Sequence, residues 1–136
     1  MFQRLLIFSI LCCFHSAAIA TKQNSKLKIA TTVSPITNIV QNVGGTAVDV
    51  KGVVPDGIDS HTFEPLPSDA KLLQEADLII VNGLDLELPT LQLAEKVKKT
   101  YVPILQLGNR VLSKEEWRYD FSFPRELGHP NPHLWL

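Results

Sequence analysis

The sequence has only two cysteines, Cys12 and Cys13, and both lie in the first 20 of its 136 residues. Those 20 residues combine a basic start at Arg4 with an apolar run, and they end in Ala-Ile-Ala at 18–20. This is the pattern of a secretory signal peptide with its cleavage site. We therefore expect a mature chain without a disulfide and without a cysteine nucleophile, so that its stability comes from its core alone.

Long apolar runs are also missing. The apolar part of residues 1–20 is shorter than the roughly 20 residues that span a bilayer, which favours a cleaved signal peptide over a membrane anchor. A lipid anchor would need a small residue before the modified cysteine, whereas Leu11 precedes Cys12. We expect export to the bacterial periplasm, with no lipid anchor and no membrane span after cleavage.

Positive charge is not in excess. The chain has 13 Lys and Arg against 14 Asp and Glu, and loss of Arg4 with the signal peptide leaves 12 minus 14, a net charge of −2. This balance gives no electrostatic basis for binding nucleic acid. The 116 residues that remain (136 minus 20) suffice for one domain with a substantial core.

Three common catalytic and nucleotide-binding motifs are absent. The first strand runs into Ser34-Pro35-Ile36 and not into Gly-x-Gly-x-x-Gly, which argues against a dinucleotide site. There is no phosphate-binding P-loop and no Gly-x-Ser-x-Gly nucleophile elbow.

Strand and helix patterns alternate along the rest of the chain. Alternating or continuous apolar runs predict strands, and apolar residues at helical spacing predict the helices between them. Short connections of this kind imply right-handed βαβ units, so we expect an α/β fold with a parallel four-stranded sheet flanked by helices. The expected strands cover residues 26–33, 47–54, 77–81 and 102–107, and the expected helices cover 34–44, 68–76 and 89–99.

Each expected helix has a start signal and an apolar face. Ser34 is predicted as an N-cap with Pro35 at the first helical position, and Ser68 and Asp69 are predicted to cap the second helix. The faces expected to point inward are Ile36, Ile39, Val40 and Val43; then Leu72, Leu73 and Ala76; then Leu91, Ala94 and Val97. After Gly108 the pattern fades, and residues 109–131 predict a short strand or an ordered loop.

His61 is the first candidate for chemistry. It lies in a loop after the second expected strand, and ligands of α/β sheets collect at the carboxyl ends of strands. Neutral imidazole is the commonest protein ligand of divalent transition metals, and Asp59 and Glu64 could orient it. Taken alone, His61 is better explained as an ordinary surface histidine.

His129 and His133 are four residues apart, a spacing that would place two imidazoles on one face of a helix. Pro130 and Pro132 prevent that helix, because proline removes backbone donors and disfavours helical conformation in the residue before it. His133, with apolar Leu134 and Trp135, is predicted to lie at the edge of a packed wall, and His129 to be an exposed loop residue.

Three segments occur in order along the chain: Asp-Ser-His-Thr-Phe-Glu-Pro-Leu-Pro-Ser-Asp at 59–69, Glu-Ala-Asp-Leu-Ile-Ile-Val-Asn-Gly-Leu-Asp-Leu-Glu at 75–87, and Asn-Pro-His-Leu-Trp-Leu at 131–136. Together they resemble the zinc and manganese solute-binding proteins of bacterial ABC transporters, the cluster A-I (cluster 9) family. Each segment alone is a weak signal, whereas the ordered set is specific.

The resemblance implies two lobes joined by a long helix, with one metal ion held between them by four protein ligands. The two ligands from the N-terminal lobe match His61 and His133, and the two from the C-terminal lobe have no counterpart in this sequence. We therefore expect residues 21–136 to be a truncated N-terminal lobe that follows a signal peptide at residues 1–20. No catalytic residue is expected.

The implied role is capture of Zn²⁺ or Mn²⁺, as transported ligand, for a membrane permease of an ABC transporter. Two imidazoles leave at least two positions of a tetrahedral zinc open, so this half-site should bind weakly and with little selectivity. Two nitrogen ligands slightly favour zinc, and manganese stays open.

Other functions remain to be weighed against capture. A zinc hydrolase would need a general base near the metal, and Glu64 is the only candidate. Some relatives were first described as adhesins, although no feature here supports adhesion directly. The chain could instead be an interaction domain without metal, in which His61 and His133 are ordinary surface residues. Only the metal hypotheses require the two imidazole rings to converge.

Overall fold

A four-stranded parallel sheet forms the centre of the protein, as the sequence predicts. The computed structural model describes residues 25–135, so the expected signal peptide lies outside the described residues. The sheet order is β2-β1-β3-β4, and every neighbouring pair is parallel. The strands are β1 (Leu27–Thr31), β2 (Val48–Gly52), β3 (Leu78–Val81) and β4 (Ile104–Gln106).

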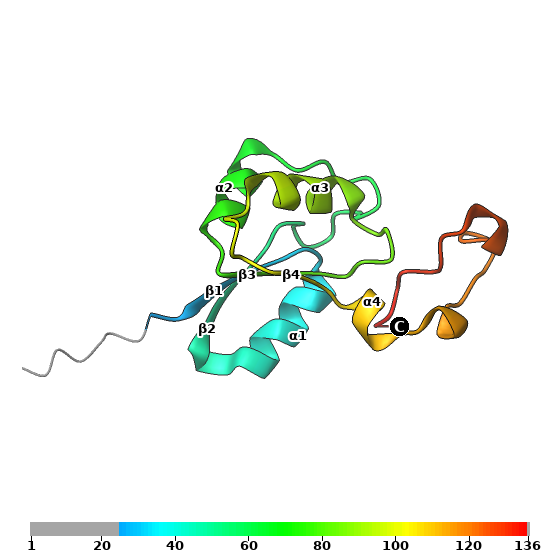
Figure 1. Cartoon of the computed structure of the whole chain (residues 1–136), viewed down its shortest axis with the longest axis horizontal. Helices are drawn as coiled ribbons and strands as arrows, with labels where there is room; N and C mark the ends of the chain where they lie inside the picture. Colours follow the sequence, from blue (N-terminus) through cyan, green and yellow to red (C-terminus); the bar gives the residue numbers. More distant parts are fainter. Residues whose placement is uncertain (1–24, 136) are drawn as a thin grey trace, which may run out of the picture.

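Helices cover both faces of this sheet. Figure 1 shows α1 on one face and α2 with α3 on the other. No helix within residues 25–135 has both the length and the hydropathy needed to cross a membrane. The helices are α1 (Ser34–Gly44), α2 (Pro67–Glu75), α3 (Leu88–Val97) and the short α4 (Gly108–Val111), with 3-10 turns at Gly45–Ala47, Lys114–Glu116 and Arg125–Leu127.

Two apolar layers fill the space between sheet and helices. Successive residues of a strand point to opposite faces, so Ile79 and Val81 pack under α2 and α3 while Ile80 packs toward α1. Leu73 of α2 and Ala94 of α3 are fully buried in the first layer, as their helical spacing predicts. A continuous apolar run such as β3 is typical of a parallel strand covered on both sides.

The predicted start and inner face of α1 are partly wrong. Val33 occupies the N-cap position, and the Ser34 hydroxyl instead donates a hydrogen bond of 2.5 Å to Asp56. Ile36 and Val40 are buried as expected, whereas Ile39 is 46% exposed and Val43 85% exposed. The sheet covers only the row of α1 that contains Ile36 and Val40, so the adjoining row that contains Ile39 and Val43 faces outward.

The start of α2 also differs from the prediction. The helix begins at Pro67, and the N-cap is Leu66, whose side chain cannot accept a hydrogen bond. Asp69 compensates from the first turn, because its carboxylate accepts a hydrogen bond of 2.7 Å from the Leu66 backbone N–H. An acidic side chain here also complements the positive end of the helix dipole, as predicted.

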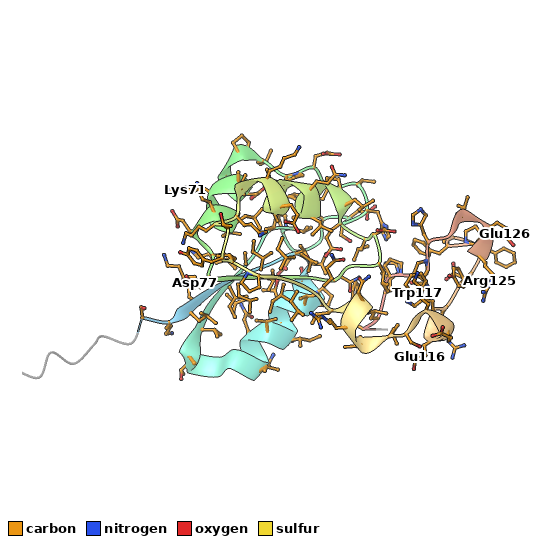
Figure 2. All side chains as sticks on the ribbon, viewed as in Figure 1. Lys71, Asp77, Glu116, Trp117, Arg125 and Glu126 are labelled. Atoms are coloured by element: carbon orange, nitrogen blue, oxygen red, sulfur yellow. The ribbon has the colours of Figure 1, made fainter. Side chains whose placement is uncertain are left out.

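Residues 112–131 form an arm beside the sheet. Figure 1 shows this segment running away from α4 and returning to it near the C-terminal end. Figure 2 places the labelled Glu116, Trp117, Arg125 and Glu126 on the arm. Within the described residues the arm contains two 3-10 turns and no strand, so the ordered-loop alternative is correct for residues 112–131, whereas residues 109–111 belong to α4 and were not predicted as helix. The Asn131 N–H donates to the Arg118 carbonyl at 2.8 Å and ties its two ends together.

A left-handed turn follows β3. Gly83, Leu84 and Asp85 have φ values of 80°, 54° and 62°, and left-handed backbone is unfavourable for residues with a Cβ atom. The turn is closed by a hydrogen bond of 3.2 Å from the Leu86 N–H to the Gly83 carbonyl. Leu84 and Leu86 are buried, which offsets part of the strain.

Gly83→Ala is expected to lower the free energy of unfolding by about 2 kcal/mol. The new Cβ would combine left-handed strain with an approach of 2.5 Å to the Asn109 side-chain oxygen. Gly128→Ala is the matched control: Gly128 has φ 75°, but no atom of the described residues would lie within 4 Å of an added Cβ, so the substitution should cost about 1 kcal/mol. Urea denaturation measures both, and equal losses would show that the close approach is harmless.

Candidate metal centre

The structure brings His61 and His133 together. His61 lies in the loop between β2 and α2, and His133 lies 72 residues further along, where the chain returns from the arm. Their Nε2 atoms are 3.3 Å apart. The loop between β2 and α2 is held near the sheet by backbone hydrogen bonds from Val53 and Val54 to residues at the end of β1.

The distance between the two nitrogens suits ligands of one metal ion. Zinc binds imidazole nitrogen at about 2.0 to 2.1 Å, and a tetrahedral angle then separates two such nitrogens by about 3.3 to 3.4 Å. Within residues 25–135 no group of three or more His, Cys, Asp or Glu residues could hold a metal ion. The metal-binding role of His61 and His133 stays a prediction.

His133 is oriented by a relay of hydrogen bonds. The Asn131 amide nitrogen donates to the Asp120 carboxylate at 2.7 Å, which leaves the Asn131 side-chain oxygen facing His133 Nδ1 at 2.8 Å. That oxygen can only accept, so Nδ1 carries the proton and Nε2 keeps its lone pair. A metal ligand needs this tautomer, with its second nitrogen hydrogen-bonded in this way.

Asp120 is suited to anchor this relay as an anion. Hydrogen bonds from the Phe123 backbone N–H and from the Asn131 side chain lower the pKa of Asp120, and the Ser122 backbone N–H contributes further. A carboxylate that is ionised accepts hydrogen bonds and cannot donate them. The direction of every bond from Asp120 to His133 is thereby set.

His61 is less constrained. Asp59 accepts a hydrogen bond of 2.9 Å from the His61 backbone N–H, so it shapes the loop but does not contact the ring. Among the described residues no hydrogen bond is made by His61 Nδ1 or by the Glu64 side chain, the other predicted orienting group. The two Nε2 atoms face each other, and a His61 tautomer with its proton on Nδ1 leaves both Nε2 lone pairs for a metal.

Aromatic rings surround the pair. Phe123 of the arm stacks on His61 with ring centroids 5.6 Å apart and meets the edge of His133 at 5.8 Å. Trp135 packs edge-on against His133 at 5.5 Å, which agrees with the predicted packed wall. These rings restrict the imidazoles to the arrangement in which their Nε2 atoms converge.

His129 does not join the pair. Its Nδ1 lies 2.7 Å from the Asp85 carboxylate, and its side chain is 57% exposed, as expected for a loop residue. Residues 129–133 contain no helix, which confirms the effect predicted for Pro130 and Pro132. The helical two-histidine site is therefore absent from the described chain.

Three contributors to the site were not predicted. Asn131 orients His133, Asp120 orients Asn131, and Phe123 packs against both imidazoles. Asn131 lies two residues before His133, a spacing at which an Asn side chain can bond the backbone N–H, as it does here at 3.0 Å. That local signal was available in the sequence, whereas the arm that carries Asp120 and Phe123 gave none.

Comparison with known proteins agrees with the geometry. A family model described as ZnuA, zinc-uptake complex component A, periplasmic, matches residues 29–136. The chain is 32% identical over 139 residues to the manganese ABC transporter substrate-binding lipoprotein PsaA of Streptococcus pneumoniae, an alignment that covers 96% of this chain and 42% of PsaA. The chain thus spans about two fifths of the length of such relatives.

Solved structures give the same result. The periplasmic zinc-binding protein TroA of Treponema pallidum matches with a TM-score of 0.69 and 25% identity, over 81% of this chain and 37% of TroA. The Mn-bound periplasmic metal-binding protein of Candidatus Liberibacter asiaticus matches with a TM-score of 0.66 and 29% identity, over 81% and 38% of the two chains.

The match over most of the chain is decisive for the family and for the class of protein. A solute-binding protein is not an enzyme, so the hydrolase alternative is dropped. The chain belongs to the ZnuA family of metal-binding proteins of ABC transporters and covers about 40% of its two-lobed relatives, roughly one lobe.

Proposed function

We propose that the chain supplies the N-terminal half of a divalent-metal site in a protein that captures Zn²⁺ or Mn²⁺ outside the inner membrane. His61 and His133 are the proposed ligands, and the metal is cargo that passes to an ABC transporter permease. The observation that carries the proposal is the 3.3 Å approach of the two Nε2 atoms from segments 72 residues apart.

Two further features support this function. The relay from Asp120 through Asn131 leaves His133 Nε2 free to bind a metal. His61 is exposed and His133 only partly buried, so an ion and further ligands can approach them from solvent. A half-open pair of ligands suits capture and release better than a closed structural site, which has four protein ligands.

The location and the metal follow from relatives and from ligand chemistry. Matched proteins are described as periplasmic or as lipoproteins, so we infer an extracytoplasmic site for this chain after cleavage of residues 1–20. PsaA is named for manganese and TroA for zinc. Imidazole nitrogen binds zinc well, and the ligands outside this chain would determine selectivity.

Calorimetric titration of the 136-residue chain with ZnCl₂ tests the proposal. We expect one weak site per chain, with affinity lost on acidification, because a protonated imidazole cannot bind metal. MgCl₂ is the control and should give no heat of binding, since magnesium prefers oxygen ligands. Absence of zinc binding would refute the metal site, and nanomolar binding by the monomer would refute the half-site.

A further inference from the structure

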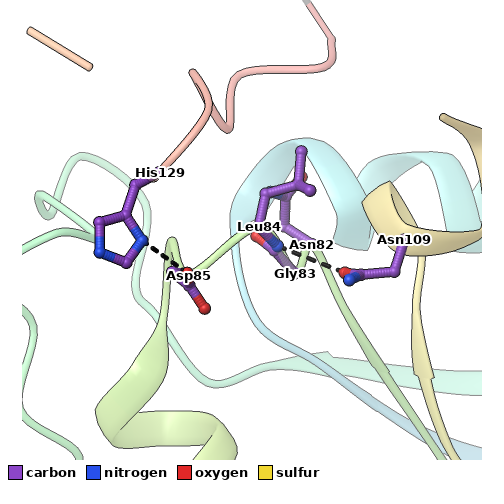
Figure 3. Close-up of polar contacts among 6 residues, drawn as sticks. All are labelled: Asn82, Gly83, Leu84, Asp85, Asn109 and His129. Atoms are coloured by element: carbon purple, nitrogen blue, oxygen red, sulfur yellow. Dashed lines mark hydrogen bonds and ion pairs between the residues drawn. The ribbon is translucent and has the colours of Figure 1, made fainter. Parts of the chain in front are cut away.

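The left-handed turn at Gly83–Asp85 faces the segment that carries His133. Figure 3 shows Asp85 of this turn paired with His129, and the Leu84 N–H directed at Asn109 of α4. Leu84 and Leu134 also pack together against Gly108, where an added Cβ would lie 2.7 Å from Leu84 Cγ and 3.0 Å from Leu134 Cδ1. The turn and the His133 segment therefore have closely fitted surfaces.

Asn82, directly before the turn, reaches the peptide bond that leads into His133. Its amide nitrogen donates to the Pro132 carbonyl at 2.9 Å and to the Gly83 carbonyl at 2.9 Å. The N–H of the same Pro132–His133 peptide donates to the Asn131 side chain at 3.0 Å. The peptide is thus held at both its oxygen and its nitrogen, which leaves little freedom for the His133 Cα.

The orientation of the Asn82 amide is itself fixed. Two carbonyl oxygens face its nitrogen, so a flipped amide would place oxygen against oxygen. Asn82 is fully buried, and its side-chain oxygen has no hydrogen-bond partner among the described residues. An unpaired buried oxygen costs free energy, so packing and the two donated bonds must hold the group in place.

Resting on the proposed metal site, we propose that Asn82 is a positioning residue for His133 and that Asp85 assists it through His129. Neither residue touches the metal. Asn82 clamps the Pro132–His133 peptide, and the pair between Asp85 and His129 fixes the same segment four residues earlier. The left-handed turn allows the Asn82 and Asp85 side chains, only three residues apart, to contact the same segment.

Asn82→Ala is the principal test, with Asn42→Ala as its matched control. Asn42 lies exposed on α1 and makes only local hydrogen bonds to Asn38. His129→Ala removes the second clamp without altering the turn, and Glu75→Ala removes the exposed contact of 3.9 Å between Lys71 and Glu75 elsewhere. If Asn82→Ala does not fold, His129→Ala still tests whether Asp85 helps to position the His133 segment. Asn82→Ser then tests whether Asn82 holds the Pro132–His133 peptide, with a smaller change in side-chain volume.

Two readouts separate positioning from general destabilisation. The first is the nitrogen chemical shifts of the imidazole rings in the metal-free chain, which report the tautomer of each histidine. We expect the single tautomer of His133 in the wild type to become a mixture in Asn82→Ala, with no change at His61. The second is zinc affinity by competition with a chelator, expected to fall about 10-fold in Asn82→Ala and about 3-fold in His129→Ala.

The two readouts also distinguish this proposal from the proposed function. Failure of the wild type to bind zinc would refute the metal site, while the His133 tautomer would still show whether Asn82 positions that ring. Wild-type zinc affinity and an unchanged His133 tautomer in folded Asn82→Ala would overturn the clamp. Equal changes at His61 and His133 would also overturn it, because they would indicate a loosened fold.

Discussion

Replacing either His61 or His133 with alanine is expected to lower the zinc affinity of the chain at least about 100-fold. Loss of a group that only orients a metal ligand costs about 10 to 100-fold, so loss of a ligand should cost no less. With one imidazole left, zinc would keep a single protein bond and otherwise be bound by water. Calorimetric titration of each variant beside the wild type measures the effect.

The chain provides a histidine control for this experiment. His129→Ala removes an imidazole that pairs with Asp85 and does not reach the two Nε2 atoms. Its effect should therefore be no more than about 3-fold, as expected for an indirect positioning role. Similar losses in all three variants would mean that zinc binds surface histidines without regard to the converging pair, which contradicts the proposed site.

The fold was predictable because its signals are local and agree with one another. Apolar runs such as residues 77–81 and helical spacing in 68–76 and 89–99 predict an alternation that has few solutions other than a parallel sheet. The same local signals fail where burial depends on distant partners. Ile39 and Val43 look like core residues of α1, yet the described structure places nothing over their side of the helix.

The site was predictable only in part. A loop histidine after a strand and a histidine among apolar residues could be named, but their 3.3 Å approach depends on how the arm folds back. Within the described residues the arm has two short 3-10 turns and no strand, so no periodic pattern could place Asp120 or Phe123 beside His133. The left-handed conformation of Leu84 was equally invisible, because leucine rarely adopts positive φ and tertiary contacts impose it here.

Glu87→Ala is expected to lower the free energy of unfolding by about 4 kcal/mol. The Glu87 carboxylate is 3% exposed and accepts hydrogen bonds from the Thr32 hydroxyl at 2.5 Å, the Asn82 N–H at 2.6 Å and the Gly83 N–H at 3.3 Å. Alanine would leave these buried donors unpaired, at about 1 to 3 kcal/mol each. Urea denaturation measures the loss.

An exposed glutamate supplies the control for Glu87→Ala. Glu64 lies in the loop after His61 and makes no hydrogen bond within the described residues, so Glu64→Ala should change stability by less than about 0.5 kcal/mol. Because Glu87 joins the ends of β1 and β3 to the left-handed turn, its loss should also weaken zinc binding. Wild-type stability of Glu87→Ala would show that water satisfies the donors and that the carboxylate is not structural.

Glu87 should also make stability depend on pH. Burial raises the pKa of this carboxyl from its ordinary value of 4.5, against the opposing effect of its hydrogen bonds to Thr32 and to the backbone. The folded state then holds the proton more tightly than the unfolded state, so stability is complete below pH 4.5 and falls as pH rises toward the folded-state pKa. Each unit of increase in that pKa corresponds to about 1.4 kcal/mol.

Glu87→Gln isolates this dependence, because glutamine keeps an oxygen for Thr32 and Asn82 but does not ionise. The stability of the wild type minus that of Glu87→Gln should therefore decline above pH 4.5 and be constant below it. The pKa values of three other carboxyls, Asp120, Glu115 and Glu116, are lowered, so their effects on stability arise at pH values below their ordinary pKa range. These effects are the same in the wild type and in Glu87→Gln, and subtraction of the two stabilities removes them. Urea denaturation at a series of pH values gives the curve. A flat difference would mean that Glu87 is ionised as readily in the folded chain as in the unfolded one, and that its hydrogen bonds fully offset its burial.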